Sequence, residues 1–150
     1  MKPKYVYHGS SIKLVGEKLI PKKANDLGKN PHNLFKGVYA SDVKNEVIAM
    51  GIISSKGVHS SSCGVERKIN TKVDAIIYEG WPKQKYLFLY TLPSKTFESK
   101  PKGSHQWVSL TPVKPEKIEK LLISDYISLV RKATKEKKIK WLKKYGEKLK

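Results

Sequence analysis

The stretch Lys36-Gly37-Val38-Tyr39-Ala40-Ser41-Asp42 joins a short apolar segment directly to residues that favour the start of a helix. Residues 35–40 have the length and composition of a short buried strand. Ser41 or Asp42 is typical of a helix N-cap. The apolar residues that follow have helical spacing and predict a helix with one buried face, made of Val43, Val47, Met50 and Ile53. We therefore expect this helix to pack back onto the sheet that contains the strand.

Other strands are predicted on both sides of this unit, by alternation or by apolar content, at residues 4–8, 73–78, 86–92 and 107–113. The run at 86–92 is the most continuously apolar, so we expect a central strand covered on both faces. Residues 118–123 fit either a strand or the start of a helix. Residues 54–64, rich in Ser and Gly, predict a loop or linker, and the chain is predicted to be helical from Ser124 onward.

The length and charge distribution predict one folded domain with a basic extension. A chain of 150 residues can bury roughly 68 to 70% of its unfolded surface, and we expect the core within residues 1–130. Residues 131–150 hold ten basic and two acidic groups. Such a block of like charge is either a solvated helix or an arm that contacts a partner. We therefore predict a domain at 1–130 followed by a basic C-terminal helical extension at 131–150.

The net charge of +18 attracts polyanions such as nucleic acid. Of the 31 basic residues only Arg67 and Arg131 are arginines. Lysine offers a point charge without the planar fork that reads guanine edges, so the composition favours contact with phosphates over reading of bases. A lysine-rich surface that serves solubility or thermal tolerance fits the same composition.

Cys63 is the one cysteine, so no internal disulfide is possible and a reducing compartment is expected. The sequence has neither an apolar run of about 20 residues nor the apolar core of a signal peptide. We expect a soluble, cytoplasmic protein that does not enter a membrane. Nothing in the sequence determines its oligomeric state.

Several common sites are excluded by the absence of their motifs. The chain has no glycine-rich phosphate loop of the G-x-x-x-x-G-K-[ST] or G-x-G-x-x-G kind, no G-x-S-x-G elbow and no H-E-x-x-H helix. The four histidines and Cys63 are too scattered to predict a metal site. Cys63 has no candidate activating partner in the sequence, and we interpret it as an inert thiol.

Three short motifs in order resemble a known family. Tyr7-His8-Gly9-Ser10, the stretch at 36–41 and Gln106-Trp107-Val108-Ser109 are similar to the Y-H-G-[ST], G-[IV]-Y-[FA]-[AS] and E-[YW]-[IV] motifs of the ADP-ribosyltransferase fold, in its diphtheria-toxin and poly(ADP-ribose) polymerase branch. The resemblance covers roughly residues 4–125. Thr96-Phe97-Glu98-Ser99-Lys100-Pro101 also resembles the acidic segment of small rifampicin-modifying ADP-ribosyltransferases. The resemblance implies an α+β fold, with a split β-sheet core and few helices.

The resemblance implies NAD as co-substrate. His8 would bond a ribose hydroxyl, the backbone of Gly9 would hold the nicotinamide amide, and Tyr39 would stack on the nicotinamide ring. The other implied contacts to NAD are Ser10, Ser41 and, in the loop that covers the donor, Asn33. The RNA 2'-phosphotransferases, which share the His-Gly motif, depend on several arginines. The two arginines of this chain lie far from His8 in the sequence, which disfavours that relative.

The chain departs from the family at the third motif. The family has a glutamate that steadies the oxocarbenium-like transition state, and this chain has Gln106. Glu98 is a candidate to supply the carboxylate instead, so Gln106 and Glu98 are the candidate catalytic residues. The resemblance implies mono-ADP-ribosyl transfer to an unidentified acceptor with release of nicotinamide. The alternative is a catalytically silent module of the same fold that binds nucleic acid through its lysine-rich surface, including residues 131–150.

Overall fold

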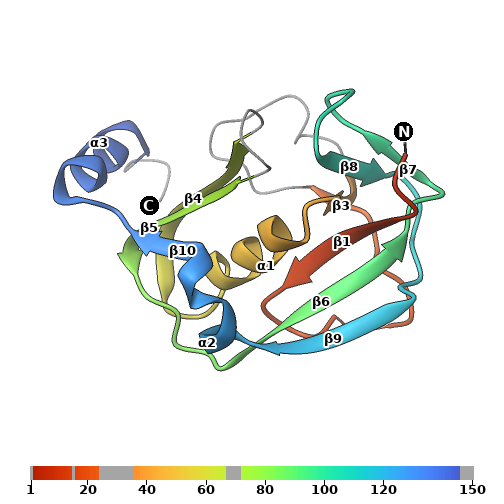
Figure 1. Ribbon diagram of the computed structural model, residues 1–150, viewed down its shortest axis with the longest axis horizontal. Helices are drawn as coiled ribbons and strands as arrows, with labels where there is room; N and C mark the ends of the chain where they lie inside the picture. The colour runs from red at the N-terminus through yellow and green to blue at the C-terminus, as the bar shows by residue number, and fades with distance from the viewer. Residues whose placement is uncertain (1, 15, 24–35, 67–71, 146–150) are drawn as a thin grey trace.

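The computed structural model describes residues 2–14, 16–23, 36–66 and 72–145. Their fold is α+β, with two β-sheets on either side of the helix α1 (Lys44–Ile53) (Figure 1). Within the described residues, no helix is both long enough and apolar enough to cross a membrane. The α+β class expected from the sequence is confirmed.

The larger sheet has seven strands among the described residues, and their pairs are antiparallel. In spatial order they are β7 (Phe97–Ser99), β8 (Gln106–Ser109), β3 (Lys36–Ser41), β1 (Tyr5–Ser10), β6 (Tyr86–Pro93) and β9 (Lys117–Leu122), with β2 (Lys22–Lys23) paired to β3. Residues 118–123, which fitted either a strand or a helix, thus form β9 up to Leu122. The neighbours β8, β3 and β1 contain the three motifs, although they lie far apart in the sequence.

The smaller sheet has the order β10 (Val130–Lys132), β5 (Lys72–Gly80) and β4 (Val58–Glu66). The prediction of a loop at residues 54–64 is wrong, because most of this segment is β4, which pairs antiparallel with β5. Serine is a weak strand former by itself, but strand preference depends strongly on context. The apolar β5 supplies a partner strand along nearly its whole length, and this pairing decides the structure of the segment.

The helix α1 begins later than the sequence predicted. Its N-cap is Val43, not Ser41 or Asp42, and no side chain caps it. The Ser41 hydroxyl instead accepts a hydrogen bond from the Val43 backbone N–H at 3.0 Å. Ser41 is still in β3, so its hydroxyl turns the chain between strand and helix rather than capping the first helical turn.

The buried surface of α1 is wider than one amphipathic stripe. Met50 was predicted to face the core, but it is 48% exposed. The helix contacts strands of both sheets (Figure 1), so residues on opposite sides of it are buried. The buried residues are Val47, Ile48, Ala49, Gly51 and Ile52. A helix between two sheets loses the single-face pattern on which the prediction depended.

The chain after β9 is not one helix. It forms the short helix α2 (Ile123–Tyr126), the 3-10 turn η2 (Ile127–Leu129), strand β10 and the helix α3 (Lys135–Tyr145). The continuous helix predicted from Ser124 is therefore wrong. Val130 lies parallel and opposite to Ala75 of β5, and its side chain is buried. The expected boundary between residues 130 and 131 falls inside β10.

Two clusters of buried side chains lie on opposite faces of the larger sheet. Leu87 and Leu89 of β6 join the cluster around α1, whereas Tyr90 and Leu92 join the other. The prediction that this strand is covered on both faces is confirmed, but β6 is an inner strand beside the edge strand β9 rather than a central one. In the described residues, all members of both clusters lie between Val6 and Val130.

Candidate functional site

Strands β1 and β3 are neighbours but pair at a single position, with Tyr7 opposite Ser41. In contrast, β1 pairs with β6 at six positions and β3 pairs with β8 at four. The residues of β1 after Tyr7, His8–Ser10, and the residues of β3 before Ser41 are not paired with each other in the ladder. We call this region the β1–β3 split.

His8 lies in the split and bonds to the opposite strand. Its Nδ1 is 2.7 Å from the backbone oxygen of Tyr39. A carbonyl can only accept, so Nδ1 carries the proton, and in the neutral ring Nε2 is the acceptor. Burial lowers the pKa of His8 below its ordinary value of 6.5, which keeps the ring neutral at pH 7. The strand was predicted to stop at Gly9, but β1 continues to Ser10, so His8 lies inside it.

The strand register brings four of the predicted site residues to one face of the sheet. Directly opposite residues of antiparallel strands point to the same face, as do residues two apart on one strand. Tyr39 and Glu98 are both opposite Val108, and Ser41 is opposite Gln106. Tyr39, Ser41, Glu98 and Gln106 therefore share a face, and α1 lies on this side.

His8 points to the other face of the sheet. It is opposite Tyr90 of β6, and the two rings lie edge to face, with their planes 60° apart and their centroids 6.1 Å apart. The imidazole of His8 and the ring of Tyr39 therefore approach the split from different sides. The roles of these two residues in binding NAD stay predictions.

Gly9 has a structural reason to be glycine. A Cβ atom there would lie 2.2 Å from the backbone oxygen of Val47 in α1. The absence of a side chain lets α1 pack directly on β1. Of the remaining predicted contacts, the Ser10 hydroxyl accepts the backbone N–H of Ile12 at 3.3 Å, and Asn33 lies outside the described residues.

The Gln106 side chain holds the loop between β7 and β8. Its Nε2 donates a hydrogen bond to the Lys100 backbone oxygen at 2.9 Å, and the Lys100 backbone N–H donates to the Gln106 backbone oxygen at the same distance. The first bond needs a donor, so a glutamate could not make it when ionised. Glu98 is exposed on the edge strand β7, diagonal to Gln106 at a typical separation of about 7–8 Å.

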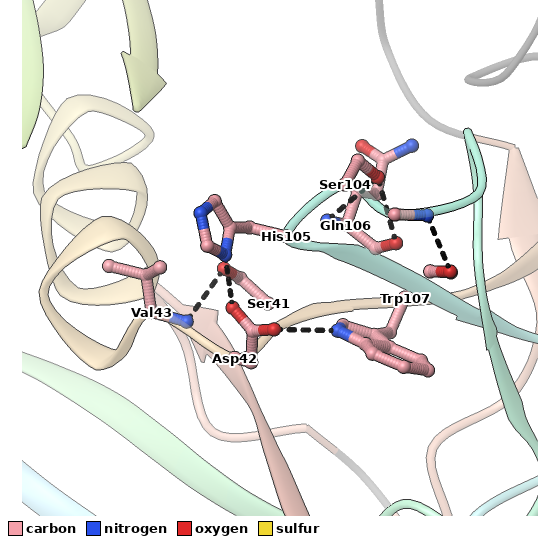
Figure 2. A network of polar contacts seen from close by, with 9 residues as sticks. Ser41, Asp42, Val43, Ser104, His105, Gln106 and Trp107 are labelled. Carbon is pink, nitrogen blue, oxygen red and sulfur yellow. Dashed lines mark hydrogen bonds and ion pairs between the residues drawn. The ribbon is translucent and has the colours of Figure 1, made fainter. Parts of the chain in front are cut away.

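A polar cluster that the sequence did not reveal joins the end of β3 to the start of β8. Asp42 accepts hydrogen bonds from His105 Nδ1 at 2.7 Å and from Trp107 Nε1 at 3.0 Å, while its backbone N–H donates to the His105 oxygen (Figure 2). Asp42 thus fastens two strands together instead of capping a helix. Each residue stands beside a predicted strand end in the sequence, but no pattern indicates that these two ends meet.

Glu46, in the first turn of α1, lies close to this cluster. Burial raises the pKa of its carboxyl group, and a hydrogen bond from Ser41 and the nearby His105 work against that rise. Burial, followed by the charge of Glu46, raises the pKa of Cys63 to about 12. The Cys63 thiol is therefore protonated at pH 7, which agrees with its interpretation as inert.

A cavity of about 250 Å³ lies elsewhere, between the connection from β5 to β6 and the helix α2. None of the predicted site residues lines it.

Comparison with models of protein families, with curated proteins and with solved structures finds no match for this chain. What the site does must therefore be inferred from its own residues and geometry.

The lowered pKa of His8 predicts a loss of stability in mild acid. Below pH 6.5 the unfolded chain takes up a proton that the folded ring resists, so the free energy of unfolding falls as the pH is lowered toward the folded-state pKa. The slope is at most about 1.4 kcal/mol per pH unit for one proton. Urea unfolding between pH 7.5 and 5 should show a steeper fall for the wild type than for His8→Gln.

Glutamine at position 8 can still donate to the Tyr39 carbonyl but does not titrate, which makes His8→Gln the matched control. Glu46 has a raised pKa, so its effect on stability has the opposite pH dependence. Its contribution to the free energy of unfolding is present below pH 4.5 and is lost as the pH rises through its folded-state pKa. Because both proteins contain Glu46, the difference between their stability curves reports the titration of His8 alone. Parallel stability curves for the two proteins would contradict the prediction.

Proposed function

We propose that the protein binds NAD at the β1–β3 split and transfers a single ADP-ribose from it to an acceptor, with release of nicotinamide. One observation carries the proposal: the strands that contain the three motifs, β1, β3 and β8, are consecutive neighbours in the larger sheet. Segments separated by tens of residues thus meet where the resemblance requires one NAD site.

The groups at the split suit the parts of NAD that the proposal assigns to them. Neutral His8, with Nδ1–H on the Tyr39 oxygen, offers Nε2 as acceptor for a ribose hydroxyl. Tyr39 offers a flat ring for nicotinamide. The proposal requires NAD to contact both faces of the sheet at the split, since His8 and Tyr39 point to opposite faces.

The reaction breaks the bond between nicotinamide and the ribose carbon C1'. Nicotinamide leaves as a neutral molecule with the bonding electron pair, positive charge develops on the ribose, and the acceptor bonds to C1' and loses a proton. A fixed carboxylate stabilises that charge. In the proposed site Glu98 supplies the carboxylate, since it shares a face with Tyr39 and Gln106.

Isothermal titration with NAD tests the binding step. Tyr39→Ala removes a stacking ring and is expected to weaken binding by about 5- to 150-fold, which corresponds to about 1–3 kcal/mol for a stacked base. Tyr39→Phe keeps the ring and should bind like the wild type, and His8→Ala should weaken binding through the lost ribose contact. Failure of folded wild-type protein to bind at millimolar NAD would sink the proposal.

Incubation with labelled NAD and a mixture of proteins and nucleic acids tests the transfer step. Label should move to an acceptor with the wild type and not with His8→Ala or Tyr39→Ala. Transfer that survives both substitutions would argue against the split as the site.

The second candidate function is a catalytically silent module of the same scaffold that binds nucleic acid. The bond from Gln106 to Lys100 favours it, because it gives the amide a structural role where the family has its glutamate. Binding of nucleic acid together with an absence of any labelled acceptor would distinguish this candidate from the transferase.

A further inference from the structure

The basic helix α3 is fixed to the smaller sheet. The rings of Trp141 in α3 and Tyr78 in β5 are stacked, with centroids 4.4 Å apart and planes 7° from parallel. The Tyr78 hydroxyl is in turn 3.0 Å from the Ser62 hydroxyl of β4. The helix is therefore a docked element of the fold and presents a defined surface.

The surface that α3 presents is made of lysine. Six lysines of the helix are exposed: Lys135, Lys137, Lys138, Lys140, Lys143 and Lys144. The helix contains one acidic residue, Glu136, whose carboxylate is 4.0 Å from the Lys140 amine. Both side chains are more than three-quarters exposed, so this pair neutralises little of the charge. Lys137, Lys140 and Lys143 follow one another at intervals of three residues, and we call them the α3 lysine face.

The composition of α3 favours nucleic acid over a membrane surface as its partner. A helix that binds a membrane surface needs an apolar face for the lipid. Trp141 packs on Tyr78 and Leu142 is half-buried, and the 52% exposed Ile139 alone is less than such a face. The helix has no arginine, and hence no planar fork for guanine edges. Its exposed amines suit a row of phosphates, whose binding is independent of sequence.

We propose that the α3 lysine face binds the phosphate backbone of nucleic acid without reading its sequence. This surface lies on the smaller sheet, at the other end of the molecule from β8 (Figure 1). It is therefore separate from the β1–β3 split, and the proposal does not depend on NAD binding. Arg131 is not part of this face. It belongs to β10, and its guanidinium bonds Asp74 at 2.9 Å.

The test compares two triple variants that remove the same charge. One replaces the face, Lys137→Gln, Lys140→Gln and Lys143→Gln. The control replaces three exposed lysines in the connections of the larger sheet, Lys95→Gln, Lys102→Gln and Lys114→Gln. Fluorescence anisotropy with mixed-sequence 20-mer duplex DNA and single-stranded RNA, at several salt concentrations, gives the affinity and its salt slope.

The face variant should bind at least about 10-fold more weakly than the control near 0.1 M salt, and its log–log salt slope should be smaller by up to about 2.7, or 0.9 for each phosphate contact. Glu136→Gln should shift the affinity in the opposite direction, several-fold tighter. Circular dichroism checks that each variant keeps its helix content.

Three outcomes would overturn the proposal. Equal weakening of the two triple variants would show that only the overall field of the molecule attracts nucleic acid. Unchanged affinity and slope in the face variant would show that α3 makes no contact with phosphate. Face-dependent binding to vesicles containing phosphatidylserine, without binding to either nucleic acid, would assign the surface to a membrane instead.

Discussion

Glutamate in place of Gln106 is expected to raise the rate of nicotinamide release from NAD by on the order of a thousandfold. A carboxylate about 4 Å from a developing positive charge, at an effective dielectric near 20, supplies roughly 4 kcal/mol, and that energy corresponds to about three powers of ten in rate. Position 106 is opposite Ser41 and on the same face as Tyr39, so the new charge would lie beside the split.

The same substitution should cost stability. Gln106→Glu replaces the donor that bonds the Lys100 oxygen at 2.9 Å with a carboxylate that repels it, and losing a hydrogen bond in this way costs about 1–3 kcal/mol. The release rate should therefore be measured, by chromatography of free nicotinamide, at a temperature where circular dichroism shows the variant to be folded.

Gln106→Ala is the matched control, because it loses the same hydrogen bond without gaining a charge, and it should not accelerate release. Tyr39→Ala added to Gln106→Glu should remove the gain. In the wild-type background, Glu98→Gln should lower the rate, since Glu98 then supplies the only proposed carboxylate. A folded Gln106→Glu protein with the wild-type rate would place position 106 outside the reaction.

Alanine at Gly9 should lower the free energy of unfolding by about 3 kcal/mol, the upper end for overpacking a core. The added Cβ would lie 2.2 Å from the Val47 oxygen and 3.0 Å from the Val47 carbonyl carbon. These are backbone atoms, which cannot rotate away, and α1 is held between two sheets. Relief of the clash would require the helix to move away from β1.

Gly51 provides a control one turn further along the same side of the helix, where α1 faces β6 of the same sheet, with the opposite sign. A Cβ there would be 3.4 Å from Leu87 Cδ1, an ordinary contact, and alanine favours a helix over glycine by about 1 kcal/mol. Gly51→Ala should be neutral or slightly stabilising in urea unfolding. A Gly9→Ala protein within about 0.5 kcal/mol of the wild type would show that β1 and α1 are not in direct contact.

The elements that local patterns define were predictable from the sequence. The run that became β6 is apolar on both sides because it contributes Leu89 to one buried cluster and Leu92 to the other. The stretch at 36–42 was correctly expected to pass from a strand to a helix, with Tyr39 near the end of β3. These features depend on residues that are close in the sequence, so the sequence alone predicts them.

The features that depend on partners distant in the sequence were decided by the tertiary structure. The serines of β4 form a strand because β5 pairs with them, and Val130 leaves the predicted helix because it packs beside Ala75. Asp42 bonds His105, 63 residues away, because β3 and β8 are adjacent. The position of α1 between two sheets determines which residues it buries. The backbone N–H and C=O groups of a single strand need hydrogen-bond partners, and the apolar side chains of a helix need a surface to pack against. Only the complete fold determines which segments supply those partners and that surface.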